Sequence, residues 1–263
     1  MRKYIDYIVI GINEYLVYPS AIWAKLFSKI IYLYLQLSIW TALFSSHGQM
    51  NPLINREDTL KYIIVATIIS ALIECNTIEW INAQIQTGNI IMEFIRPIDF
   101  RKMIFSRHLG DSIVKIVFYC VPLSVLANVV IRRPLLCREQ ILYGLLSIIL
   151  AYGIQFLYSL IIGLLAFWLI VTWPLNMLLG AVYKLLSGVW IPVTMFPDIL
   201  HKINSFLPFR AIYAIPVTIM TSRMNTQNIW KDIRTQFIWI IFLFVITEII
   251  WKIGKRKLIV QGG

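Results

Sequence analysis

The chain has 263 residues, of which 59% are apolar and 14% are charged, and its formal net charge is +11. Soluble domains have about 45–50% apolar and about 25% charged residues, and a chain of this length cannot bury so large an apolar excess in a core of its own. The composition therefore excludes an ordinary soluble domain and predicts an integral membrane protein. The basic residues flank apolar segments and form no continuous stripe, which favours contacts with membrane lipid over nucleic-acid binding.

Residues 1–20 predict an amphipathic helix that lies on the membrane surface. Apolar side chains recur there at helical spacing, while charged and tyrosine side chains occupy the other positions. A helix of this composition rests in the head-group layer and does not cross the bilayer. The segment lacks a clean apolar core followed by small residues, so we expect no cleaved signal peptide.

Six apolar segments predict an all-α architecture of six transmembrane helices, since a span needs about 20 mostly apolar residues. The expected spans are 22–44, 59–81, 109–131, 140–172, 175–190 and 235–253. The longest clearly charged interruption between spans, 82–108, separates the second and third. Residues 191–217 are apolar but contain four prolines, and because proline interrupts long helices, we expect a re-entrant extracellular segment between spans five and six.

Six spans place both termini on one side of the membrane, and the basic residues indicate which side. The densest clusters of Lys and Arg lie between Arg96 and Arg107 and in the C-terminal tail, and such clusters favour the cytoplasm. Arg132, Arg133 and Arg138 count against this orientation, because it places them outside. We expect cytoplasmic termini and a cytoplasmic loop at 82–108.

Three ionisable residues within or near the apolar segments are candidates for function: Glu74, Lys184 and Glu248. A charge at a helix centre costs roughly 2.5–3.5 kcal/mol on insertion scales. These groups either pair between helices or line a polar path. Asp111 and Lys115 lie four residues apart and can neutralise each other on one helical face. An ion- or proton-coupled carrier that uses Glu74 and Glu248 is the alternative function, although the two halves show no convincing internal repeat.

The sequence shows no motif for catalysis, so we expect no enzyme activity and no cofactor or metal in this chain. It lacks the phosphate-binding GxxxxGK[ST] loop, the HExxH zinc motif and the GxSxG nucleophile motif. Its three cysteines and three histidines are scattered and include no CxxC pair, so no zinc site is indicated.

The order of these features resembles the permease of a type-2 ABC exporter, over nearly the whole chain. The inner loop reads GNIIMEFIRPIDF from Gly88 to Phe100, and a proline-rich SG…P…FP stretch begins at Ser187. An LPF…P stretch begins at Leu207, and the chain ends in KRKLIVQGG. Each motif is short, so the resemblance rests on their order.

The resemblance implies a transport mechanism with several subunits. Two permease chains, identical or different, would pair in a bacterial cell membrane, and two ABC ATPase subunits holding ATP and magnesium would dock beneath them. The expected cargo is an amphipathic peptide, antibiotic or lipid-like compound, with a path along spans two and five and an outer lid at 191–216. The N-terminal helix would contact the ATPase, and the main coupling residues would be Gly88, Ile91, Glu93, Phe94, Arg96, Pro97 and Arg101. The alternative to a coupling role is that this loop is only a solvated basic connection between two spans.

Overall fold

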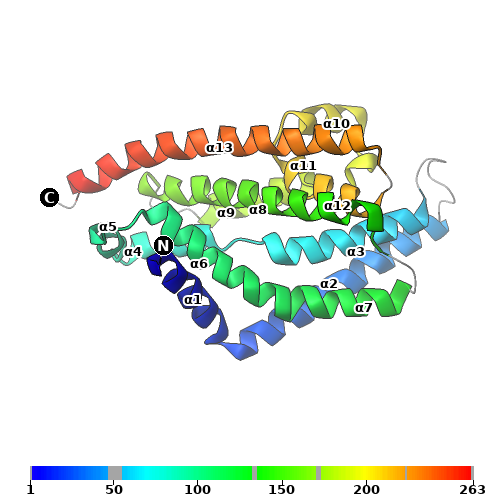
Figure 1. Ribbon diagram of the computed structural model, residues 1–263, viewed down its shortest axis with the longest axis horizontal. Helices are drawn as coiled ribbons and strands as arrows, with labels where there is room; N and C mark the ends of the chain where they lie inside the picture. The colour runs from blue at the N-terminus through cyan, green and yellow to red at the C-terminus, as the bar shows by residue number, and fades with distance from the viewer. Residues whose placement is uncertain (1, 47–54, 132–134, 170–172, 223, 262–263) are drawn as a thin grey trace.

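The computed structural model describes residues 2–46, 55–131, 135–169, 173–222 and 224–261, and every regular element in these ranges is a helix. Most of the long helices run roughly along one axis and form an elongated bundle (Figure 1). The all-α architecture expected from the sequence is confirmed.

The first half of the chain forms seven α-helices and one π-helical turn. In order they are α1 (Arg2–Leu16), α2 (Pro19–Ser46), α3 (Arg56–Ile73), α4 (Thr77–Gln86), α5 (Ile90–Ile95), α6 (Phe100–Lys115), the π-helical η1 (Ile116–Cys120) and α7 (Val121–Ile131). Helices α6, η1 and α7 follow one another without a gap and so form one continuous helical segment.

The second half contains the central helix and a series of short helices. In order they are η2 (Arg138–Gln140), α8 (Ile141–Leu164), η3 (Leu165–Phe167), α9 (Trp173–Leu186), η4 (Val193–Met195), α10 (Asp198–Ser205), α11 (Phe209–Ile212), α12 (Ala214–Thr221) and α13 (Thr226–Gln261).

Five helical segments are long and apolar enough to cross a membrane: Pro19–Ser46, Arg56–Gln86, Phe100–Val129, Arg138–Phe167 and Thr226–Arg256. They coincide with the expected spans one to four and six, so the chain is a multi-pass membrane protein. The expected fifth span corresponds to α9, which has 14 residues. At 1.5 Å per residue it is about 21 Å long, less than the roughly 30 Å hydrocarbon layer, and the count of six is therefore not confirmed.

The helix bounds differ from the expected ones at two places in the first half. Asp99 accepts hydrogen bonds from the backbone N–H groups of Arg101 and Lys102 and so caps α6 at Phe100, which makes the third span begin nine residues before residue 109. The segment 82–108 is therefore largely helical, and the connection between α4 and α6 is reduced to residues 87–99. The second span is also interrupted, because α3 ends at Ile73 and α4 begins only at Thr77.

The proline-rich segment 191–217 folds into four short helices. Pro192, Pro197 and Pro208 stand immediately before η4, α10 and α11, where a fixed φ and a missing N–H do no harm to the helix. The last of these helices, α12, packs against α3 and α8. That the segment is re-entrant and lies on the outer side stays a prediction.

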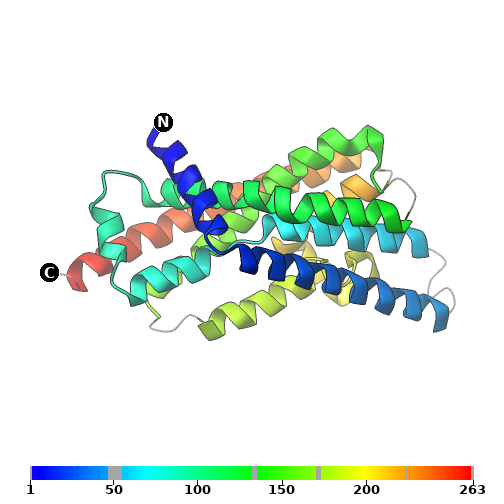
Figure 2. The ribbon, with the colours of Figure 1, turned by 90° about the horizontal axis from the view of Figure 1, so that it is seen from below.

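The core is built around α8, which packs against α13, α12 and α4. Along α8, Ile154, Leu160 and Leu164 are almost completely buried, as expected for a helix that is apolar on all sides. The peripheral helices α2 and α13 instead expose large apolar side chains such as Phe27 and Ile241. Seen from below, α2 runs along the edge of the bundle (Figure 2). Exposed apolar faces of this kind suit lipid or a second membrane chain.

Candidate functional site

The N-terminal helix α1 is anchored by an unusually close crossing with α6. A Cβ atom placed on Gly11 would overlap the carbonyl oxygen of Arg107, and one placed on Gly110 would overlap the carbonyl oxygen of Ile8. The two backbones therefore touch, as small residues allow in membrane helices. An ion pair between Glu14 of α1 and Arg107 of α6 lies beside the crossing, so α1 is attached both by packing and by charge. Its predicted position on the membrane surface is not tested by these contacts.

The predicted coupling residues lie in the connection that leads from α4 through α5 to α6. Gly88 has φ +73°, a conformation that glycine adopts at no steric cost, and it turns the chain from α4 into α5. Ile91 and Phe94 belong to α5, but their side chains lie outside the described residues. Pro97 follows α5, which ends at Ile95, and is exposed; proline at this place prevents the helix from continuing.

Arg96 links this connection to α1. Its guanidinium donates a hydrogen bond to the Tyr7 hydroxyl at 3.0 Å and forms an ion pair with Glu93 at 3.1 Å. The bond to Tyr7 and the Glu93 carboxylate raise the pKa of Arg96 above its ordinary value. The arginine side chain remains about half exposed, so a partner protein could still reach it.

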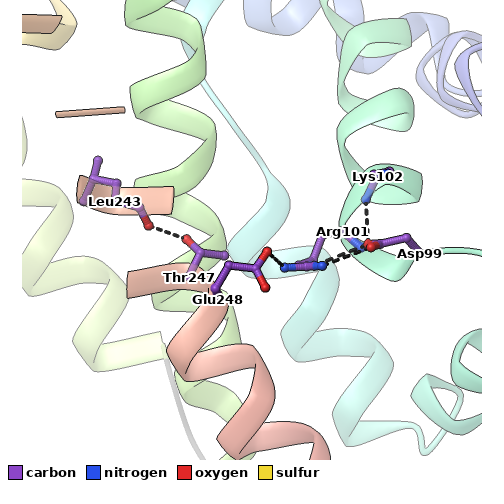
Figure 3. Close-up of polar contacts among 6 residues, drawn as sticks. All are labelled: Asp99, Arg101, Lys102, Leu243, Thr247 and Glu248. Atoms are coloured by element: carbon purple, nitrogen blue, oxygen red, sulfur yellow. Dashed lines mark hydrogen bonds and ion pairs between the residues drawn. The ribbon is translucent and has the colours of Figure 1, made fainter. Parts of the chain in front are cut away.

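Arg101 links the start of α6 to α13 (Figure 3). It forms ion pairs with Asp99, at 3.0 Å, and with Glu248 of α13. Partial burial alone would raise the pKa of the Asp99 carboxyl, but the hydrogen bonds from Arg101 and from two backbone N–H groups outweigh it and hold that pKa below its ordinary value. The Phe100 ring stacks on Trp251 with 5.3 Å between centroids. The connection 87–99 and the start of α6 are thus attached to both the first and the last helix.

The other two intramembrane candidates, Glu74 and Lys184, line a separate cavity of about 700 Å³. The cavity lies among α2, the break between α3 and α4, α8 and α9. Glu74 forms an ion pair with Lys29 of α2 at 2.8 Å. Glu74 is therefore paired with a cation of another helix, whereas Lys184 forms no ion pair among the residues that the structure describes.

The charges around the helix break are arranged differently from the sequence-based expectation. Lys115 donates a hydrogen bond to the backbone carbonyl of Glu74 at 2.5 Å, while Asp111 faces His108 at 4.0 Å. Asp111 and Lys115 thus form no direct ion pair with each other in the described part of the chain, although they lie four residues apart. Glu248, by contrast, lines a different cavity of about 470 Å³ beside Arg101, so the structure does not bring Glu74 and Glu248 together.

Sequence reasoning missed several residues of these two regions. Lys29 pairs with Glu74, and nothing in one sequence distinguishes such a pair from a lysine that extends to lipid head groups. Gly11 and Gly110 each interrupt a helical segment, and a glycine inside a helical pattern was the available signal for a close packing contact.

Comparison with curated proteins gives no significant match. The sequence does match the model of a family described as ABC-2 family transporter protein, over residues 30–262. The match covers every candidate membrane span at least in part, and it includes the connection 87–99 and all of the residues that line the polar cavity except Ser28 and Lys29. The chain therefore belongs to the ABC-2 transporter family and is a membrane permease of the ABC type.

Proposed function

We propose that this chain is the permease subunit of an ATP-driven exporter in a bacterial cell membrane. Two such permeases, identical or different, move an amphipathic peptide, antibiotic or lipid-like substrate outward, and separate ABC ATPase subunits with bound ATP and magnesium supply the energy. Both termini and the connection 87–99 face the cytoplasm.

The observation that carries this proposal is the attachment of the α5 connection to the first and last helices. Arg96 contacts Tyr7 of α1, and Arg101 contacts Glu248 of α13. Both chain termini also lie at the end of the bundle that carries α5 (Figure 1). A partner that pushes on α5 would therefore act on several long helices at once, which a solvated loop without such contacts would not allow.

The ion-coupled carrier that uses Glu74 and Glu248 is not proposed. Each carboxylate has its own cationic partner, and the two residues line different cavities. No observation on the described chain joins them in one path.

The test is a pull-down of the tagged chain from its native membrane in mild detergent, followed by mass spectrometry and an ATPase assay. We expect an ABC ATPase subunit in near-equal amount, and hydrolysis that falls when Arg96→Glu is introduced. The matched control is Arg138→Glu, which reverses the charge of an exposed arginine in η2, outside the connection 87–99. A chain that purifies without an ATPase, or equal hydrolysis in both variants, contradicts the proposal.

A further inference from the structure

We propose that the 700 Å³ cavity at the α3–α4 break binds an anionic head group that also carries hydrogen-bond donors, such as a hydroxylated phosphate. The inference that this ligand is the exported cargo rests on the proposed function, but binding itself does not. The volume falls in the range of small-molecule sites, which is about 300–1,000 Å³.

The location of the cavity is the first argument. The second candidate span is interrupted between Ile73 and Thr77, and Glu74, Cys75 and Asn76 of this interruption all line the cavity. Backbone that leaves its helix within a membrane span is tolerated where protein or a water-filled cavity surrounds it, and transporters place binding sites at such breaks. The ten-residue helix α4 begins there, and its Asn76 N-cap makes no side-chain capping bond.

The charge balance of the cavity favours an anion. Two lysines, Lys29 and Lys184, and two glutamates, Glu74 and Glu79, line it. Lys115 reaches the backbone of the break from behind through the Glu74 carbonyl and leaves one cation in excess. Glu74 already has Lys29 as a partner, whereas Lys184 has no ion pair in the described part of the chain. Lys184 is therefore available to an anionic ligand, whereas the N-terminus of α4 already has Glu79 in its first turn.

Unpartnered polar atoms in the same cavity indicate that the ligand also donates hydrogen bonds. Gln155 is only 6% exposed, and its Oε1 atom has no hydrogen-bond partner among the described residues. The same holds for the Tyr158 hydroxyl, and both residues line the cavity. A buried polar atom without a partner costs free energy, because it has lost its hydrogen bonds to water. A bare anion such as a simple alkyl sulfonate could accept a hydrogen bond from the Tyr158 O–H, but only a hydroxyl or N–H group of a ligand could donate to the Gln155 Oε1.

The cavity also has an apolar side that suits an amphipathic molecule. Its lining includes Met177 of α9 and Trp190, and Met177 is largely exposed at the bundle surface. A head group held at the break could therefore extend its alkyl chain along α9.

The test measures ligand-induced thermal stabilisation of the full chain, purified in a neutral maltoside detergent. The probes are lysophosphatidylglycerol, lysophosphatidylcholine with the same acyl chain, and sn-glycerol 3-phosphate, and the apparent Kd follows from the midpoint shift against concentration. We expect saturable stabilisation by lysophosphatidylglycerol and little by lysophosphatidylcholine, whose head group lacks both net charge and donors. Equal affinity for sn-glycerol 3-phosphate would identify a soluble anion as the ligand, and a preference for the lysolipid would identify an amphiphile; both support the site.

The decisive variant is Lys184→Gln, because it leaves the Glu74–Lys29 pair intact. We expect it to weaken the apparent affinity about tenfold or more, as the loss of a charge-assisted hydrogen bond does. Lys202→Gln is the matched control, since Lys202 is an exposed lysine on α10, outside the cavity. An unchanged affinity in Lys184→Gln, equal stabilisation by both lysolipids, or no saturable stabilisation at all overturns the proposal. The assay contains no ATPase, so a failure of the exporter proposal would not alter its result.

Discussion

Replacing Gly110 by alanine should loosen α1 from the rest of the molecule. The new Cβ would overlap the carbonyl oxygen of Ile8 and would lie 3.0 Å from the backbone nitrogen of Ile12, well inside the normal carbon contact of about 3.5–4.0 Å. Both neighbours are backbone atoms, so no side-chain rotation relieves the clash and the two helices must separate. Overpacking of this kind costs about 1–3 kcal/mol.

This cost translates into a measurable opening of α1. At 1.36 kcal/mol per factor of ten, about 1–3 kcal/mol corresponds to a loss of roughly 5-fold to 150-fold in the hydrogen-exchange protection of the α1 amides. Hydrogen exchange followed by mass spectrometry measures this directly. Gly180→Ala is the matched control, because a Cβ there meets nothing within 4 Å, and it should leave α1 unchanged. Undiminished protection of α1 in Gly110→Ala would refute the proposed backbone contact.

Two further predictions concern the ion-pair network in Figure 3. Glu248→Gln should lower the free energy of unfolding by about 1–3 kcal/mol, because Arg101 loses a charged partner at a partly buried site. A double-mutant cycle with Arg101→Gln, measured by thermal unfolding, checks this. Additive effects of the two substitutions would contradict a direct interaction. Asp99 has a lowered pKa, so the folded state binds fewer protons than the unfolded state. Its contribution is therefore present above the unfolded pKa near 4 and is lost as the pH falls through the folded value. Asp99→Asn should flatten the dependence of the unfolding midpoint on pH below about 4, and an unchanged slope would contradict this assignment.

The helices themselves could be predicted from the sequence, because apolar length is a local property. Five of the expected spans contain a helix that is long enough to cross a membrane. The start of α6 was placed nine residues too late because Arg101, Lys102 and Arg107 appeared to belong to a polar loop. In the structure Arg101 and Arg107 pair with Glu248 and Glu14, which lie far away in the sequence. A pattern along one chain does not reveal such partners.

The candidate site was only partly predictable for the same reason. The connection between α4 and α6 could be located from its motif, although its coupling role stays a prediction, and Glu74, Lys184 and Glu248 stood out as charges in apolar surroundings. Which of them share a cavity depends on how the helices pack. Lys29 pairs with Glu74 across 45 positions of sequence, and Glu248 pairs with Arg101 across 147. The candidate polar residues therefore form two separate clusters, and each cluster combines segments that lie far apart in the sequence.

Helix α4 connects these two regions, and this gives the proposed transport cycle a physical path. It begins at the break that lines the cavity and ends at the turn into α5. Because α3 and α4 are separated by three non-helical residues, α4 can tilt without carrying α3 with it, whereas a continuous helix would resist. Under the proposed function, a displacement of α5 by an ATPase would reach the cavity through ten helical residues. The positions of Glu74 and Asn76 relative to Lys184 would then change, so that the affinity for an anionic head group would depend on the state of the ATPase.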